Sequence, residues 1–488
     1  MAVDLSETAV DHPLDPLASE EISAAVDIFE AEWDVADEAV YHLVVLDEPE
    51  KEFVRSFEPG DHFDREAFLV VRQDGETYEA SVSITGEELL DVTHIEDVQP
   101  AITPPEVDQA EEAVINDPDW QEAAAKRGVE NFDLAIVDPW PASGFEPEAY
   151  DDRRLVRAIS WIRTEEEDNG YARPIEGLFA FVDLDEMEVV KIEDNGVVDE
   201  DSPLPPEDAD FRADRVDTRD DFKHLDVVQP EGPSFEVAGQ TVEWLDWEFQ
   251  VGWTPREGLV FHDVTFEDDG EKRKVLHRAS ASEMAVPYGD SDPNHSWKEA
   301  FDIGEFHVGR MANVLTEGCD CLGEMHYFDV AMNDTNGDPK TLPNAICMHE
   351  EDDGVLWKHT EWRKEHTEVR RRRRLVVSFI ATVYNYDYGF YWYFYPDGSI
   401  EGEVRLTGID SNGMVPADED ATDTNGEYEL VAPQVKTSIH QHHFNFRLDF
   451  DIDDTPNRVK EVHNEPVGSD RKKGFKAKET IMGSEMEA

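Results

Sequence analysis

The chain has 488 residues, enough for two to four domains. Hydrophobic residues make up 39% of it, including 11 Trp and 25 Phe, so it can build cores and is not intrinsically disordered. Its 42 Lys and Arg stand against 115 Asp and Glu, and the net charge of −73 argues against nucleic acid and anionic membranes as partners.

This acidity indicates a salt-adapted, halophilic origin, because near 1 M salt the screening length falls to about 3 Å and self-repulsion becomes short-ranged. The one basic run, Arg370 to Arg374, is expected to pair with carboxylates beside a strand rather than to bind phosphates. No signal peptide and no run of 18 apolar residues is visible. We therefore expect a cytoplasmic protein.

Residues 1–98 are predicted to form a small N-terminal α+β domain. A helix is expected over Pro16–Glu32 and a strand over Val40–Leu46. A hairpin follows, with strands at Ala67–Val71 and Tyr78–Ile84 around a turn at Asp74–Gly75.

Residues 99–197 repeat this order of helix and then strands, which predicts a second small α+β domain. Helices are expected over Pro104–Asn116 and Trp120–Gly128. The expected strands are Leu134–Val137, Leu155–Arg163 and Gly177–Glu188, with a turn at Asn169–Gly170. Neither module carries a cluster of chemistry-bearing side chains.

Residues 198–233 are rich in Asp, Glu and Pro, the composition of a linker. Residues 234–488 then show many short strand-like runs and hardly any helix pattern, which predicts a large antiparallel β-sandwich that is incomplete at the C-terminus. The fold class is therefore α+β. The tail after Asn457, rich in Lys and Glu, has no strand pattern that would close the sandwich.

His440 and His442 are the clearest candidate metal ligands. Residues two apart in a strand face the same side, so this pair can present two imidazoles to one ion. Imidazole suits copper, zinc, iron and nickel, so the pair alone does not name the metal. A cupin is excluded, because Asn445 and Phe446 occupy the positions where a cupin carries Glu.

The segment Thr382-Val383-Tyr384-Asn385-Tyr386-Asp387-Tyr388 gives this pair a context. On its own, such an aromatic run suits a buried strand. Tyr386 lies 54 residues before His440, however, and Asp302 lies 84 residues before Tyr386. Together these features resemble the copper amine oxidases, densely so over roughly residues 235–455. In that family the matching tyrosine is converted by its own copper site into topaquinone.

The resemblance implies oxidation of a small primary amine by O2 to aldehyde, ammonia and hydrogen peroxide. Tyr386 is the matching topaquinone precursor, which would form a Schiff base with the amine, and Asn385 precedes it. Asp302 matches the proton acceptor, and Tyr288 matches the tyrosine that hydrogen-bonds a quinone oxygen. If Asp302 is that base, it should be buried in apolar surroundings that raise its pKa.

The resemblance also assigns the remaining site residues. His440 and His442 would bind copper(II), and Asp449 would bind a peripheral calcium or manganese ion. Cys321 and Cys347 match an intrachain disulfide. Family members are homodimers, so we expect a homodimer.

Ala300 stands two residues before Asp302, where relatives often carry a bulkier gate side chain. A small residue there suggests a wide entrance, compatible with aryl-alkyl amines.

One feature departs from the family pattern. The family's copper has a third histidine well beyond the pair, whereas after His443 this chain has only His463, in a polar segment that does not match. The simplest hypothesis is a truncated copy of a longer enzyme. Three functions stay open: the amine oxidase, an inactive fragment acting as a structural or binding module, and a β-sandwich metal enzyme that uses His440 and His442 without a quinone.

Overall fold

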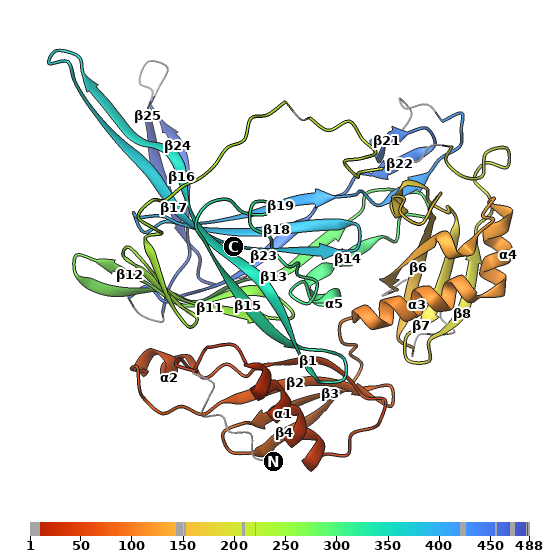
Figure 1. Cartoon of the computed structure of the whole chain (residues 1–488), viewed down its shortest axis with the longest axis horizontal. Coiled ribbons are helices and arrows are strands. Elements are labelled where there is room, and N and C mark those ends of the chain that lie inside the picture. The colour runs from red at the N-terminus through yellow and green to blue at the C-terminus, as the bar shows by residue number, and fades with distance from the viewer. Residues whose placement is uncertain are drawn as a thin grey trace.

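The computed structural model describes residues 10–142, 150, 153–206, 210–219, 221–419, 426–453, 456–468, 474–484 and 486. Its elements form two small sheets with helices and a larger strand-rich region, coloured red, orange to yellow, and green to blue in Figure 1.

The first small region is a four-stranded antiparallel sheet in the order β1-β2-β3-β4, with α1 packed on it. Its elements are α1 (Ser19–Glu32), β1 (Val40–Leu46), α2 (Lys51–Ser56), β2 (Glu66–Gln73), β3 (Glu76–Ser83) and β4 (Glu88–Ile95). Helix α1 buries Ile22, Val26 and Phe29 at helical spacing. It begins three residues later than predicted, because the Glu21 carboxylate accepts a hydrogen bond from the N–H of Ala18 and caps the helix there.

The second region has the same arrangement of helices followed by a sheet in the order β5-β6-β7-β8. Its elements are α3 (Pro104–Asn116), α4 (Pro118–Lys126), β5 (Ala135–Pro141), β6 (Leu155–Ile162), β7 (Leu178–Asp183) and β8 (Glu188–Asp194). The strand expected over Gly177–Glu188 is wrong in extent: β7 ends at Asp183 and a turn containing Met187 at φ 50° leads into β8. A positive φ at Met187 cannot continue a strand.

The strand-rich region is built around two large sheets. A seven-stranded sheet holds β9 (Phe235–Ala238), β10 (Thr241–Trp244), β11 (Trp247–Thr254), β12 (Gly258–Asp268), β13 (Glu271–Pro287), β14 (Glu299–Phe301) and β23 (His443–Phe450). A five-stranded sheet holds β15 (Met325–Asn333), β16 (Pro339–Glu361), β17 (His366–Val383), β18 (Tyr386–Phe394) and β19 (Ile400–Gly408).

Aromatic rings from the two sheets meet in a common core. Phe249 of β11 stacks on Phe394 of β18 with ring centroids 4.5 Å apart, and Phe261 of β12 contacts Trp392 of β18 at 5.5 Å. Both pairs join one sheet to the other, as in a sandwich. The predicted α+β fold with a large antiparallel β-sandwich is therefore confirmed.

Strands β16 and β17 extend beyond the sandwich as a long hairpin (Figure 1). We call its outer part, residues 350–374, the arm. The basic run lies on it and pairs with carboxylates, as predicted. The pairs are Arg370 with Glu368, Arg371 with Asp352, Arg372 with Asp353, Arg373 with Glu350 and Arg374 with Glu351.

The tail after Asn457, in which no strand pattern that would close the sandwich was expected, forms a separate two-stranded sheet. β24 (Lys460–Val467) and β25 (Gly474–Ile481) form an antiparallel hairpin. Lys460 pairs with Glu479 across it at 3.0 Å. Nearly all its side chains are exposed, so the hairpin lacks the apolar alternation by which a strand is predicted. In the part of the chain that the structure describes, no helix has the length and apolar character needed to cross a membrane.

Candidate active site

Tyr386 is the first residue of β18 and follows a two-residue hairpin loop, Tyr384 and Asn385, at the end of β17. The Asn385 side-chain amide donates to the carbonyl of Ile409 at 2.6 Å. Gly408 lies so close that a Cβ there would come within 2.5 Å of the Asn385 carbonyl oxygen. The loop before Tyr386 is therefore fixed by its neighbours.

His440 and His442 lie between β22 (Val435–Ser438) and β23, where the chain passes from the small β20-β22-β21 sheet to the seven-stranded sheet. That small sheet also contains β20 (Asn412–Met414) and β21 (Tyr428–Ala432). The expectation that the pair sits within a strand is therefore wrong, although His440 makes an isolated antiparallel bridge with Tyr288. The two rings still lie together, with centroids 5.0 Å apart.

The hydrogen bonds around the two imidazoles indicate which nitrogens carry protons. His440 Nδ1 lies 2.8 Å from the Ser438 carbonyl oxygen, so it must be the N–H donor. Its Nε2 then accepts from the Tyr386 hydroxyl at 2.8 Å. Burial raises the pKa of Tyr386 to about 12, which keeps this phenol protonated.

His442 has the same tautomer. The Tyr388 hydroxyl donates to Asp302 Oδ2 at 3.1 Å, so its contact of 3.3 Å with His442 Nδ1 is a donation from the ring N–H. Burial, followed by the nearby His440 and His443, lowers the pKa of His442 to about 4, so the ring is neutral. Both imidazoles can thus offer an Nε2 lone pair to a metal ion.

This donor set fits copper(II), which accepts neutral imidazole nitrogen. Among the described residues, no third histidine, cysteine or carboxylate gathers with His440 and His442. His463, the histidine that follows His443, is exposed on β24 and pairs with Glu461.

Asp302 begins the short helix α5 (Asp302–Phe306), and its residue is only 6% exposed. Burial raises the pKa of Asp302 to about 7, against the lowering effect of the Tyr388 hydrogen bond. The expectation of a buried carboxyl with a raised pKa is confirmed. A carboxyl that is half ionised near neutral pH can take up and release a proton there.

Tyr288 lies beside both the histidine pair and Tyr386. Its ring stacks on His440 with centroids 4.6 Å apart and planes at 17°. Burial, and then the neighbouring Tyr386 phenol, raises the pKa of Tyr288 well above its ordinary value. Tyr288 is therefore a neutral phenol beside both the histidine pair and Tyr386.

A cavity of about 20 Å³ lies among these side chains, room for about one water. The predicted residues that line it are Ala300, Asp302, Tyr288, Asn385 and Tyr386. The wide entrance expected from Ala300 stays a prediction, but bulky side chains line the same cavity and leave it little free volume. These are Trp140, Phe306, Tyr384 and Tyr388.

Asp449 lies away from this cavity, on β23. It forms an ion pair with Lys51 of α2 at 2.6 Å, so a cation already balances its charge. It does not gather with two further ligands in the described residues.

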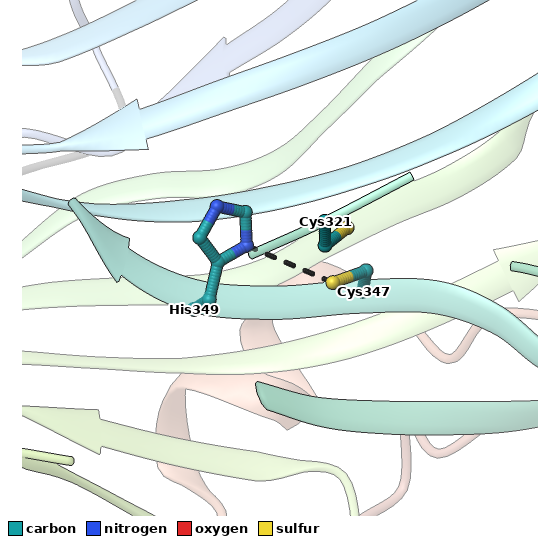
Figure 2. A group of neighbouring side chains, drawn as sticks. All are labelled: Cys321, Cys347 and His349. Carbon is teal, nitrogen blue, oxygen red and sulfur yellow. Dashed lines mark hydrogen bonds between the residues drawn. The ribbon is translucent and has the colours of Figure 1, made fainter. Parts of the chain in front are cut away.

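The two buried cysteines lie beside His349 (Figure 2). The Cys347 sulfur is 3.6 Å from His349 Nδ1, and the ligand atoms of Cys321, Cys347 and His349 lie within 4.8 Å of one another. Both cysteines are free thiols here. The hydrogen bond from Cys347 lowers the pKa of the Cys321 thiol to about 6, which favours its thiolate form.

Comparison with known proteins gives matches along almost the whole chain. Residues 236–488 match the enzyme domain of copper amine oxidases, residues 105–214 match the N3 domain and residues 12–95 match the N2 domain of the same proteins.

Among curated relatives, the primary amine oxidase of Arthrobacter sp. strain P1 is 43% identical over 486 residues, covering 98% of this chain and 73% of that protein. The histamine oxidase of Arthrobacter globiformis is 38% identical, covering 99% of this chain and 71% of that protein. Among solved structures, a copper-containing benzylamine oxidase from Hansenula polymorpha superposes with a TM-score of 0.85 at 28% identity, covering 96% of this chain and 76% of that one.

Proposed function

The chain belongs to the copper amine oxidase family, and from this we propose that it oxidises primary amines with dioxygen, using copper and topaquinone at Tyr386. The overall reaction is RCH2NH2 + H2O + O2 → RCHO + NH3 + H2O2. The observation that carries the proposal is the 2.8 Å contact of the Tyr386 hydroxyl with His440 Nε2, which places the phenol at the histidine pair.

His440 and His442 would hold the copper ion through Nε2, since both Nδ1 atoms carry protons. Copper and dioxygen would supply topaquinone at Tyr386, an electrophilic carbonyl that no ordinary side chain offers. The Ser438 carbonyl and the Tyr388 hydroxyl accept hydrogen bonds from the two Nδ1–H groups, which leaves each Nε2 free of a proton. Hydrogen bonds to the second nitrogen of a metal-binding histidine commonly fix its tautomer in this way.

Asp302 would take the proton from the α-carbon of the amine. Its pKa of about 7 suits a base that works near neutral pH, and the hydroxyl of Tyr388 orients its carboxylate. Positioned proton transfer of this kind contributes a factor of about 10² to 10⁴.

Tyr288 would hydrogen-bond the oxygen of the converted Tyr386, since burial keeps its phenol protonated. Asn385, tied to the Ile409 carbonyl, would fix the backbone from which Tyr386 projects. Water is limited to what a cavity of about 20 Å³ admits.

We extend the proposal to assembly and cysteine chemistry. The arm carries exposed apolar side chains, with Trp362 72% and Leu356 59% exposed, as expected of a hairpin that packs on a second subunit of a homodimer. The thiols of Cys321 and Cys347 are neighbours, which would allow the disulfide under oxidising conditions. The ion pair of Asp449 with Lys51 weighs against a peripheral calcium or manganese ion at that residue.

Hydrogen peroxide release tests the function. In high salt and after incubation with Cu(II) in air, the chain should release one peroxide and one ammonia for each methylamine consumed, and none from trimethylamine. Tyr386→Phe should release none, while Tyr395→Phe, a change just after the end of β18 and outside the cavity, should keep turnover. Equal peroxide from the wild type and Tyr386→Phe would refute the proposal.

A further inference from the structure

Tyr384 is a cavity residue that the proposed chemistry does not use. It is the first residue of the loop before Tyr386, and its φ of 54° lies in the left-handed region that favours glycine and asparagine. A bulky aromatic residue in this conformation is strained, so its presence calls for a gain elsewhere.

The hydroxyl of Tyr384 does not supply that gain. In the part of the chain that the structure describes, its oxygen is buried without a hydrogen-bond partner. Burial, and then the carboxylates of Asp138 and Asp302, raises the pKa of Tyr384 well above its ordinary value, so the phenol is neutral. A buried hydroxyl without a partner is itself unfavourable.

The ring of Tyr384 is the part with a visible role. It packs edge to face on Phe306 with centroids 4.9 Å apart, and both side chains line the amine cavity. Ala300 leaves room in the same cavity, yet only about 20 Å³ is free. That volume suits a group of about the size of one water or methyl, not an aromatic ring.

We propose that Tyr384 is a specificity-determining residue, whose ring fills the space that an aryl or long alkyl substituent would need and so restricts the substrate to short alkyl primary amines. This inference rests on the proposed function, in which the cavity receives the amine. Short alkyl amines thus replace the aryl-alkyl amines that Ala300 suggested, because the ring of Tyr384 occupies the volume that the small Ala300 side chain leaves.

A binding measurement decides the question without copper or quinone. The full chain is produced with Tyr386 unmodified and titrated with 4-fluorobenzyl alcohol, followed by ¹⁹F NMR in high salt. This neutral isostere is preferable to the amine, because a surface with a net charge of −73 binds cations unspecifically.

Tyr384→Gly and Tyr384→Asn should bind the probe at least 10-fold more tightly than the wild type. Both residues tolerate the left-handed backbone, so one of them serves if the other folds poorly. Tyr384→Phe should bind like the wild type, because the ring and not the hydroxyl excludes the probe. Adding Ala300→Trp to Tyr384→Gly should abolish the gain, which assigns it to this cavity.

Wild type and Tyr384→Gly binding the probe equally would overturn the inference, as would an equal gain in Tyr384→Phe. A gain that survives Ala300→Trp would overturn it too. In the copper-treated protein, Tyr384→Gly should shift the kcat/KM ratio of benzylamine to methylamine at least 10-fold toward benzylamine. Turnover with an unchanged ratio contradicts this inference alone, whereas no peroxide from any variant, with the binding difference intact, contradicts the proposed function alone.

Discussion

The two ends of β17 place charged groups in opposite settings. On the arm, Arg371 and Asp352 pair while each stays more than half exposed, at 58% and 57%. At the other end, β17 runs into the loop before Tyr386, where Asp302 is 6% exposed and forms no ion pair with a cation among the described residues. Exposed pairs are screened by water and salt, but a buried carboxyl must change its pKa. The charged pairs on the arm therefore keep a solvated surface. The buried carboxyl at the cavity instead gains a pKa that allows proton transfer near neutral pH.

The largest effect should come from removing one imidazole of the pair. His440→Ala leaves a single imidazole nitrogen to bind copper. Loss of a residue that only hydrogen-bonds a metal ligand lowers metal affinity roughly 10- to 100-fold, so loss of the ligand itself should lower copper affinity by more. His443→Ala, an exposed neighbour, is the matched control. Copper content after dialysis measures both, and equal retention in the two variants would contradict the assignment.

Asp302→Asn should lower kcat/KM about 10²- to 10⁴-fold, because no carboxylate remains to take the proton. Asp352→Asn on the arm should leave kcat/KM unchanged. In the wild type, kcat/KM should fall as the pH drops below about 7, where Asp302 becomes protonated. A wild-type profile that stays flat down to pH 5 would rule out Asp302 as the base.

The same substitution should affect stability in the opposite direction. Burial raises the folded-state pKa of Asp302 to about 7 from its usual 3.8, so between these values the folded protein binds more protons and loses stability as pH rises. Asp302→Asn removes this loss and should stabilise the protein at pH 8 by on the order of 1 to 4 kcal/mol. The gain should be smaller at pH 5. Urea unfolding in high salt measures this gain at both pH values. A gain over the wild type that is smaller at pH 8 than at pH 5 would contradict the prediction.

The smallest effect belongs to the arm. Arg371→Gln breaks an exposed pair and should change the free energy of unfolding by less than about 1 kcal/mol, and by less again at high salt. A loss of several kcal/mol would mean that the arm is covered in solution, as a dimer would cover it. Sedimentation of the same variant distinguishes that case.

Local signals predicted the elements whose sequence patterns agree with their surroundings. Strand β1 and helix α3 have the predicted bounds, because an apolar run in one and a capped amphipathic repeat in the other decide their structure locally. The β24 and β25 hairpin was missed, since exposed Lys and Glu carry no apolar period. The resemblance to the copper amine oxidases pointed to Tyr386, Asp302 and the histidine pair, and their roles stay predictions.

The remaining parts of the site depend on tertiary contacts. Trp140 comes from β5 in the second region and lines the cavity, but nothing in its own segment marks it. Tyr384 belongs to the Thr382–Tyr388 motif, yet its proposed role depends on a backbone angle and a cavity volume that a sequence does not state. The strand geometry expected for His440 and His442 failed because the chain changes sheets there. The domain boundaries, the homodimer, the halophilic origin and the cytoplasmic location stay predictions.

Conversion of Tyr386 to topaquinone at the histidine pair can be tested directly on the protein. The chain is incubated in high salt with Cu(II) in air, treated with phenylhydrazine and digested. A coloured adduct on the peptide that contains Tyr386 is the predicted result. Folded, copper-loaded protein in which Tyr386 is recovered as unmodified tyrosine, with no coloured adduct, would contradict this conversion.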